Sequence, residues 1–256
     1  MATAPPASDR TFVRFLSLVI AAVVLAGCAG GPEAQRAQAL LERAQAEQLK
    51  LRTAAFSAEF GVTANGQKLA FVLDGAAAMN KARGGDMWFR MTGTGMGGED
   101  FEMKMSKRGS RVTVSAQGET QTFAAGDAGA PKLDTLGSLG SFDFSSCIKS
   151  VDVAEGRRLN REAATRIAGT VDTACVLKAA VALGGVAGGS APQVDFDQLS
   201  KYVDDVQATL FVSERSHLLI GALITTSIEA MGQSADVQIR YRLTRVNKPL
   251  RFPPGL

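Results

Sequence analysis

Few residues of this chain have types suited to catalysis or metal binding, and their spacing does not assemble a site. The single histidine, His217, lies in a turn-like stretch without a nucleophile beside it, and one imidazole cannot build the multi-histidine zinc sites of common hydrolases. The closely spaced glycines of Thr92–Asp100 join two apparent antiparallel strands, whereas a dinucleotide site needs them between a parallel strand and a helix. Adjacent carboxylates without a cleft are solvated charges, and these are the pairs Glu99/Asp100 and Asp204/Asp205. We therefore expect no enzyme, no metal and no cofactor.

Cys28 has the context that most specifically indicates chemistry. It ends the run Leu25–Cys28, which follows a segment with Arg10 and Arg14 and an apolar stretch, Phe15–Ala26. This stretch is shorter than the ~20 residues of a bilayer-spanning helix, and the order of charge, apolar run and small residues is that of an export signal peptide. Leu25–Cys28 resembles a bacterial lipobox, in which the cysteine thiol receives a diacylglyceryl group and becomes the first residue of the mature chain.

The expected organisation follows from this signal. Residues 1–27 would be removed, residues 28–33 would form the lipid anchor and a short tether, and residues 34–256 would form a single domain. The alternative is an uncleaved anchor helix, or an ordinary signal with an incidental cysteine. The lipoprotein interpretation places the chain in the cell envelope, on the outer face of the cytoplasmic membrane or on an outer membrane if one is present. A five-residue tether spans no more than ~18 Å, so the folded body would stay close to its membrane.

Composition excludes some partners and leaves the state of two cysteines open. Removal of residues 1–27 leaves 229 of the 256 residues and changes the net charge from +3 to +2, too near neutral for a nucleic-acid-binding protein. The remaining cysteines are Cys147 and Cys175. Outside the cytoplasm such a pair usually forms a disulfide, here closing a loop that would stabilise the fold by about 3 kcal/mol; the alternative is two buried free thiols.

The spacing of apolar residues changes along the chain, from the period of a helix to the alternation of strands. Ala34–Arg52 has the composition and spacing of an amphipathic helix. The pattern then alternates with period two, which predicts an antiparallel meander with an Asn-Gly hairpin turn at Ala64–Gln67. The expected strands of the meander lie near 56–63, 69–73, 87–91, 101–105 and 112–114, and later ones at 150–153, 165–171, 207–213, 218–228 and 235–243. Short helices are expected in the middle, at 131–142, 172–183 and 196–203.

Three patches resemble the LolA/LolB-like fold, and within it the LppX/LprG-type envelope lipoproteins. They are Ala39–Phe60 for the first helix and strand, Arg161–Ala179 for a strand entering a helix, and Val237–Pro254 for the last strand and its proline-containing tail. The resemblance implies an α+β, mainly antiparallel half-open β-barrel, with helices covering a concave face that holds lipid acyl chains. Members of this group carry lipoproteins or acylated glycolipids and have no catalytic residues.

One side of the alternation is apolar enough to form such a wall. The candidate residues are Phe56, Phe60, Phe71, Leu73, Met87, Phe89, Met91, Phe101, Met103, Met105, Ile220, Ile224, Ile239 and Tyr241. The opposite side carries Glu59, Asp74, Asp86, Arg90, Glu102 and Lys104, which we expect to face water. Methionine adapts to irregular apolar ligands, although a dry core in which it fills gaps would give the same pattern.

The sequence therefore favours a membrane-anchored lipoprotein that binds acyl chains of a lipid, glycolipid or lipoprotein for transfer to an acceptor or transporter protein. The alternative is a structural or regulatory envelope protein that uses the same half-barrel to bind a protein partner. Near the end of the chain are Arg240, Arg242, Arg245, Lys248 and Arg251, which could meet anionic headgroups or simply face solvent.

Overall fold

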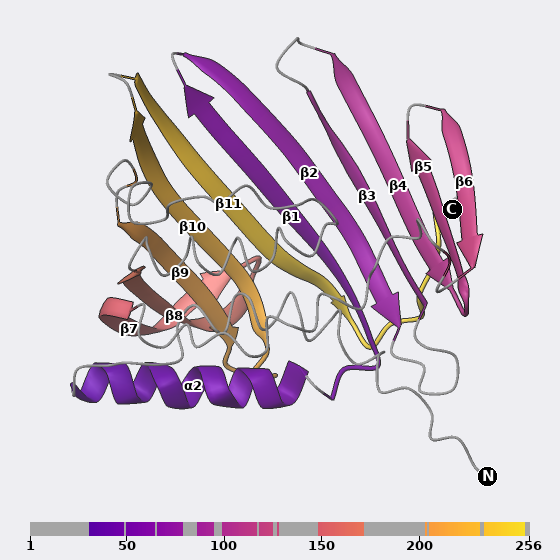
Figure 1. The fold of residues 1–256 in the computed structure, drawn as a ribbon. Helices are drawn as coiled ribbons and strands as arrows, with labels where there is room; N and C mark the ends of the chain where they lie inside the picture. Colours follow the sequence, from indigo (N-terminus) through magenta and orange to yellow (C-terminus); the bar gives the residue numbers. More distant parts are fainter. Residues whose placement is uncertain are drawn as a thin grey trace.

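The computed structural model describes residues 31–48, 50–64, 66–78, 86–94, 99–116, 118–124, 127, 148–171, 203, 205–230 and 233–253. These residues form an α-helix and an eleven-stranded sheet (Figure 1). The elements of the first half are α2 (Pro32–Gln48), β1 (Thr53–Ala64), β2 (Gln67–Ala78), β3 (Asp86–Thr94), β4 (Asp100–Arg108), β5 (Arg111–Ala116) and β6 (Glu119–Ala124). Those of the second half are β7 (Ile148–Leu159), β8 (Glu162–Val171), β9 (Val206–Ser213), β10 (Leu219–Ala230) and β11 (Gln233–Val246).

The strands follow one another across the sheet in the order β6-β5-β4-β3-β2-β1-β11-β10-β9-β8-β7, and every neighbouring pair is antiparallel. The chain thus winds outward from β1 to β6, restarts at the far edge with β7, and returns to place β11 beside β1. Within the described residues β6 and β7 do not pair with each other, so the sheet is unclosed. The expectation of a mainly antiparallel, unclosed sheet is confirmed.

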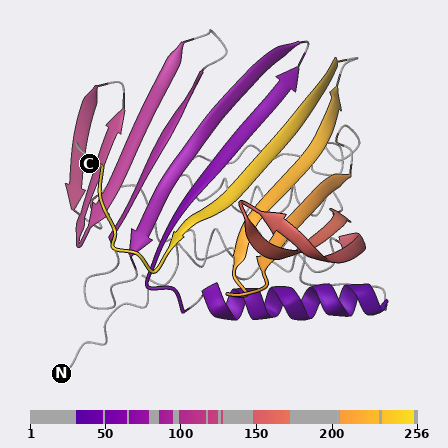
Figure 2. The ribbon, with the colours of Figure 1, turned by 180° about the vertical axis from the view of Figure 1, so that it is seen from behind.

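Helix α2 lies across one end of the sheet (Figures 1 and 2). Its buried residues recur every three or four positions and are Ala34, Ala37, Leu41, Ala44 and Gln48. This spacing gives one apolar stripe, and the stripe packs against β7, β9 and β10. The helix ends before the predicted Arg52, because the Leu51 N–H donates to the Gln48 carbonyl at 3.2 Å and closes the last turn.

The hairpin β7–β8 is longer than the sequence predicts. Instead of a polar turn between 153 and 165, the strands continue to a tight turn in which Asn160 and Arg161 have φ angles of 53° and 72°. The register of β7 also shifts between Ala154 and Arg157, where Gly156 has a φ of 67°. A bulge and exposed charged residues on an edge strand hide the period of two from sequence reasoning.

Two further differences concern strand ends. β6 is an edge strand of mostly exposed polar residues. Its sequence has no alternation of apolar residues, so the strand was not predicted. β3 continues to Thr94, through part of the stretch interpreted as a glycine-rich turn.

Several expected features lie outside the described residues. They are the signal peptide with Cys28, the helices at 131–142 and 172–183, the cysteines Cys147 and Cys175, and most of the helix at 196–203. Of that last segment, Val203 forms an isolated antiparallel β-bridge with Ile228 and so is paired with a strand at this point. Covering of the sheet by helices remains a prediction.

The larger apolar core lies where α2 meets the sheet. Leu41, Ile167, Leu210 and Leu219 are almost completely buried there, together with Tyr241. A second, smaller cluster is formed by Leu51, Ala54, Ala77, Met87, Ala164, Leu218 and Ile220. Both clusters therefore include residues near the strand ends closest to α2.

Candidate functional site

Strand register brings the apolar candidates onto one face of the sheet. Leu73 of β2 pairs with Ala58 of β1 and with Met91 of β3, and Met91 pairs in turn with Met103 of β4. On the other side Ala58 pairs with Tyr241 of β11. Directly paired residues of an antiparallel sheet point to the same side, so this face, called the apolar face below, runs without interruption across the central strands.

The apolar face contains the predicted wall residues with one exception. It carries Phe56, Phe60, Phe71, Leu73, Met87, Phe89, Met91, Phe101, Met103, Met105, Ile224, Ile239 and Tyr241. Ile220 is the exception, because it lies at a register shift between Leu219 and Gly221 and packs in the smaller core cluster.

The opposite face of the sheet is mostly polar, although Val72, Trp88 and Leu223 also lie on it, and ion pairs connect its charged side chains within and between strands. Glu102 of β4 pairs with Arg90 at 2.5 Å and with Lys104 at 2.9 Å, and hydrogen bonds from Lys104 and Arg90 lower the pKa of the Glu102 carboxyl. Arg166 of β8 similarly pairs with Asp152 of β7 at 2.5 Å. The contrast between the two faces matches the expected division into a wet side and an apolar side.

Burial on the apolar face changes along β1 to β4 and β10, whereas Val171 of β8 and Val206 of β9 remain buried at the end far from α2. On β1 Phe56 is buried and Phe60 half-buried, and on β4 Met105 is buried and Met103 half-buried. On β1 to β4 and β10 the apolar face is therefore closed at the end that meets α2 and more accessible toward the other end. The accessible part, called the half-buried region below, consists of Phe60, Val62, Leu69, Phe71, Leu73, Phe89, Met91, Phe101, Met103, Val114, Ile224, Ile228, Val237 and Ile239.

Glycines set how the aromatic rings lie on this face. Gly93 of β3 is paired on its two sides with Phe71 and Phe101, and a Cβ at Gly93 would stand 2.7 Å from the Phe71 Cβ. Gly75, opposite Phe56, would place a Cβ 2.4 Å from the Phe56 ring. The Phe56 ring therefore lies over Gly75 and the Phe101 ring over Gly93, while the Phe71 ring stacks on the Phe60 ring with their centroids 5.0 Å apart. Sequence reasoning missed the role of Gly93, although it continues the alternation of Phe89 and Met91.

Two polar side chains lie within the apolar pattern at its buried end. Lys107 of β4 pairs with Met87 and Val112, and 9% of its surface is exposed, which the sequence prediction of an uncharged wall did not anticipate. Tyr241 is buried beside Ala58, and loss of hydration raises the pKa of its phenol above the usual value. The phenol is accordingly neutral at physiological pH.

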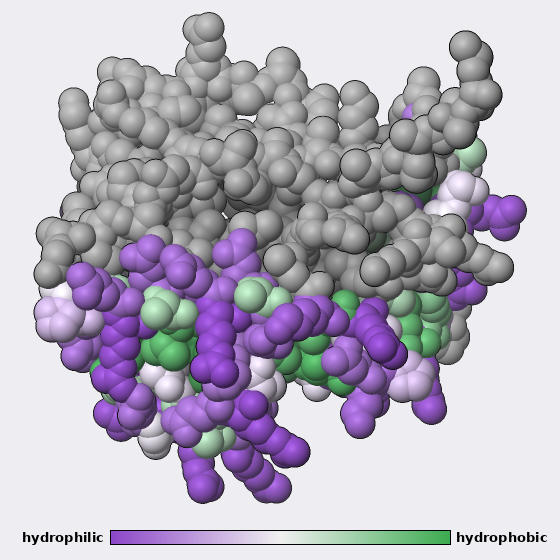
Figure 3. Space-filling view, turned by 90° about the horizontal axis from the view of Figure 1, so that it is seen from below, coloured by the Kyte–Doolittle hydropathy of each residue, from purple (hydrophilic) through white to green (hydrophobic). Residues whose placement is uncertain are grey.

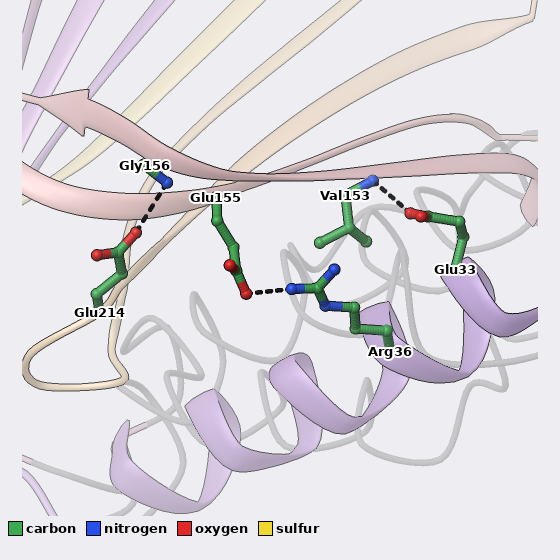
Figure 4. Close-up of polar contacts among 6 residues, drawn as sticks. All are labelled: Glu33, Arg36, Val153, Glu155, Gly156 and Glu214. Carbon is green, nitrogen blue, oxygen red and sulfur yellow. Dashed lines mark hydrogen bonds and ion pairs between the residues drawn. The ribbon is translucent and has the colours of Figure 1, made fainter.

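Carboxylates fasten α2 and a turn to the edge strand β7 (Figure 4). The Val153 N–H donates to Glu33 Oε2 at 3.0 Å, and Arg36 forms an ion pair with Glu155. Beside them the Gly156 N–H donates to Glu214 Oε1 at 3.1 Å. Two N–H groups of the edge strand are thereby paired. The contacts of Glu33 and Arg36 hold the helix against the sheet, and the contact of Glu214 holds the turn between β9 and β10.

The C-terminal segment runs along the strand ends at the same end of the molecule. The Asn247 N–H donates to the Thr53 carbonyl at 2.8 Å, and the Thr53 hydroxyl donates to the Lys248 carbonyl at 2.5 Å. Farther along, the Arg108 guanidinium lies 3.9 Å from the centre of the Phe252 ring. These contacts connect the end of β11 to the end of β4. Seen from the α2 end, the described surface is mostly hydrophilic, with small hydrophobic patches (Figure 3).

The described residues contain no group of three or more His, Cys, Asp or Glu side chains placed to hold a metal ion. His217 lies in the β9–β10 turn with a φ of 55°, and its N–H donates to the Ser213 carbonyl at 2.9 Å. None of the helices in the described ranges has the length and apolar character needed to cross a bilayer.

No protein-family model and no curated protein matches the chain. Among solved structures it is similar to the lipoprotein LppX of Mycobacterium tuberculosis, with 13% identity, 83% of this chain and 96% of that chain covered, and a TM-score of 0.41. For LprF of Mycobacterium bovis the identity is 14%, the coverage 88% and 98%, and the TM-score 0.45. For the MucA/MucB complex of Pseudomonas aeruginosa the identity is 16%, 82% of this chain and 56% of that chain are covered, and the TM-score is 0.33.

Proposed function

We propose that this chain is a lipid-anchored protein of the cell envelope that binds the acyl chains of a lipid, glycolipid or lipoprotein on the half-buried region and transfers them to an acceptor. The observation that carries the proposal is the burial gradient on the apolar face. Apolar side chains of seven strands remain half-buried on one face, while the other face of the same sheet is mostly polar.

The energetics of binding would come from removal of hydrocarbon from water. Each buried methylene contributes about 0.8 kcal/mol, so an acyl chain can be held without any charged or catalytic group. Met91 and Met103, which are neighbours across β3 and β4, can adapt their unbranched side chains to a flexible chain. The unclosed sheet would let cargo enter and leave without rupture of strand pairing.

Attachment to the membrane would come from Cys28. A diacylglyceryl group and a further acyl chain on this residue would hold the protein firmly at the membrane surface, where a single chain would not. Export would also favour a disulfide between Cys147 and Cys175.

The test is the lipid content of the full-length protein, purified from membranes under mild conditions and extracted for mass spectrometry. We expect a non-covalent acylated lipid in near-stoichiometric amount. Protein that carries no lipid, and takes up none when offered detergent-solubilised envelope lipids, would contradict acyl-chain binding and favour the alternative of a protein partner.

A pair of variants links the lipid to the proposed face. Ile239 of β11 lies between Phe60 and Ile224 on the half-buried region, whereas the adjacent Gln238 lies between Gly61 and Thr225 on the polar face. A charge at Ile239 would be buried against hydrocarbon, which is strongly unfavourable. Ile239→Glu should therefore lose most of the bound lipid and Gln238→Glu should keep it, with circular dichroism confirming that both remain folded. Equal retention by two folded variants would place the lipid elsewhere.

A further inference from the structure

The two ends of the sheet carry opposite charge. At the end that meets α2, exposed basic residues flank the turns, among them Arg108 and Arg111 at β4–β5, Arg158 and Arg161 at β7–β8, and Lys248 and Arg251 after β11. At the opposite end the exposed charged residues of the described ranges are mostly acidic. They include Glu99 before β4, Asp100 at the start of β4, Glu119 on β6, Asp205 before β9 and Glu229 on β10, with Lys68 as a basic residue among them.

The basic residues form a row along the whole width of the sheet. Strand order places the β4–β5 turn toward one edge, the start of β1 and the end of β11 in the middle, and the β7–β8 turn at the other edge. The contact between Arg108 and Phe252 keeps the C-terminal segment along this row. We call the row the basic rim.

Carboxylates at the basic rim are engaged by protein donors. Glu214 accepts the Gly156 N–H at 3.1 Å, Glu162 accepts the Ser213 hydroxyl, and Asp86 accepts the Gly109 N–H at 3.0 Å. They serve to fix the turns. The basic side chains that extend from these turns are exposed, and Arg111, Arg161 and Lys248 are all of this kind.

The start of the described chain is at the same end of the molecule. Gly31 directly precedes α2, and α2 lies across this end of the sheet (Figure 1). Gly31 follows Cys28 by three residues in the sequence. Three residues span no more than ~11 Å. An acyl anchor at Cys28 would therefore hold this end, rather than the acidic one, at the membrane.

From these observations we infer that the basic rim docks on the anionic surface of a phospholipid membrane, an inference that rests on the lipid anchoring in the proposed function. Each Lys or Arg near such a surface contributes about 1 kcal/mol, or roughly fivefold in binding. Repulsion between the acidic end and the anionic membrane would favour the same orientation. The basic rim would add an electrostatic contribution to the attachment that the acyl chains on Cys28 provide.

This orientation determines where cargo is exchanged. The half-buried region lies toward the acidic end of the strands, because on β1 and β4 the residues nearest the basic rim are the buried ones. With the basic rim on the membrane, the accessible end of the apolar face points away from it. Acyl chains would then be exchanged with an acceptor located away from the anchoring membrane.

The experiment is hydrogen–deuterium exchange on the full-length lipidated protein reconstituted on phosphatidylcholine vesicles with and without phosphatidylglycerol. Phosphatidylglycerol should slow exchange roughly fivefold or more in peptides covering the turns at Gly109–Ser110 and Asn160–Arg161. Peptides covering Gly66 and Gly118, which lie in turns at the acidic end, should not change. The protection should disappear on raising NaCl from about 0.1 M to about 1 M, because the screening length falls from about 10 Å to about 3 Å.

Two variants with the same loss of charge test the position of the effect. Arg111→Gln/Arg161→Gln/Lys248→Gln removes three charges from three segments of the basic rim and should abolish the protection. Arg90→Gln/Lys104→Gln/Arg240→Gln removes three charges from the polar face and should retain it. Equal loss in both variants would mean that net charge alone matters and would overturn the inference.

The other outcomes are equally decisive. Identical exchange on the two kinds of vesicle would overturn docking on anionic lipid. Protection of the basic rim by a soluble polyanion such as polyglutamate, without protection by phosphatidylglycerol, would assign it to an acidic protein instead. Lipid bound in the purified protein is measured separately by mass spectrometry and should be unchanged in the rim variant, so failure of docking is distinguishable from failure of acyl-chain binding.

Discussion

At the scale of single residues, the apolar face depends on where side chains are missing as much as on where they are large. Gly93 is flanked by Phe71 and Phe101, and Gly75 faces Phe56. Glycine usually weakens a strand, and its presence here marks close approach of neighbouring groups. The Phe56 and Phe101 rings are thereby placed over glycine backbone, while the rings of Phe60 and Phe71 stack on each other.

Gly93→Ala should destabilise the protein by about 1–3 kcal/mol, the range for overpacking. The added Cβ would lie 2.7 Å from the Phe71 Cβ and 2.8 Å from the Ala70 carbonyl oxygen, neither of which can rotate away. Gly61→Ala is the matched control, because its Cβ would meet only the Gln238 carbonyl oxygen at 4.0 Å. Urea unfolding measures the free energy of unfolding of both variants. Equal stability of the two would contradict the packing described for Gly93.

The buried phenol of Tyr241 predicts how the free energy of unfolding depends on pH. Burial raises its pKa above the usual 10.0, so the unfolded chain loses the phenol proton before the folded protein does. The contribution of this group to stability is complete below the unfolded pKa and falls as the pH rises through about 10 toward the higher folded value. The free energy of unfolding should therefore decrease less between pH 9 and pH 11 (about 10 ± 1) in Tyr241→Phe than in the parent. Parallel pH profiles for both proteins would show that the phenol is hydrated.

At the scale of elements, the sequence predicts strands well where one side of the strand is apolar. The alternation of Phe56, Phe60 and their successors predicts β1–β5, and β9–β11 are found near their expected positions. β6 and the outer half of β7 were not predicted, because exposed edge strands carry polar residues on both sides. Ile220 left the expected face because a register shift in β10 has no signature in its residues.

The burial gradient could not be predicted from sequence either. Phe56 and Phe60 are the same residue type four positions apart on the same face, yet only Phe56 is buried. The difference depends on which strand ends α2 covers, and this is a property of tertiary packing. For the same reason the alternation could not decide between a dry core and a binding wall.

Helix α2 is expected to hold the closed end of the apolar face through Leu41. This residue is completely buried in the larger core cluster, while its neighbour Leu40 is half-buried at its margin. Leu41→Ala should lower the free energy of unfolding by about 2–5 kcal/mol, the range for fully buried leucine, and Leu40→Ala by clearly less. Thermal or urea unfolding compares them. A larger effect at Leu40 would mean that the helix is rotated from the described position.

At the scale of the whole molecule, one direction organises the features described. Along β1 to β4 and β10 the apolar face changes from buried to half-buried, and along the sheet as a whole the exposed charge changes from basic to acidic. Helix α2, which begins four residues after Cys28 in the sequence, and the C-terminal segment both lie at the buried, basic end. A protein built in this way would hold its membrane at one end and present its binding region at the other.

The most direct measurement is to map the position of a bound acyl chain. Full-length protein is loaded with a fatty acid that carries a photoreactive diazirine, irradiated, digested and analysed by mass spectrometry. The account predicts crosslinks to half-buried residues of the apolar face on adjacent strands, such as Phe60, Phe71, Met91 and Met103. Crosslinks confined to the polar face, or saturable loading without any crosslink to these strands, would contradict it.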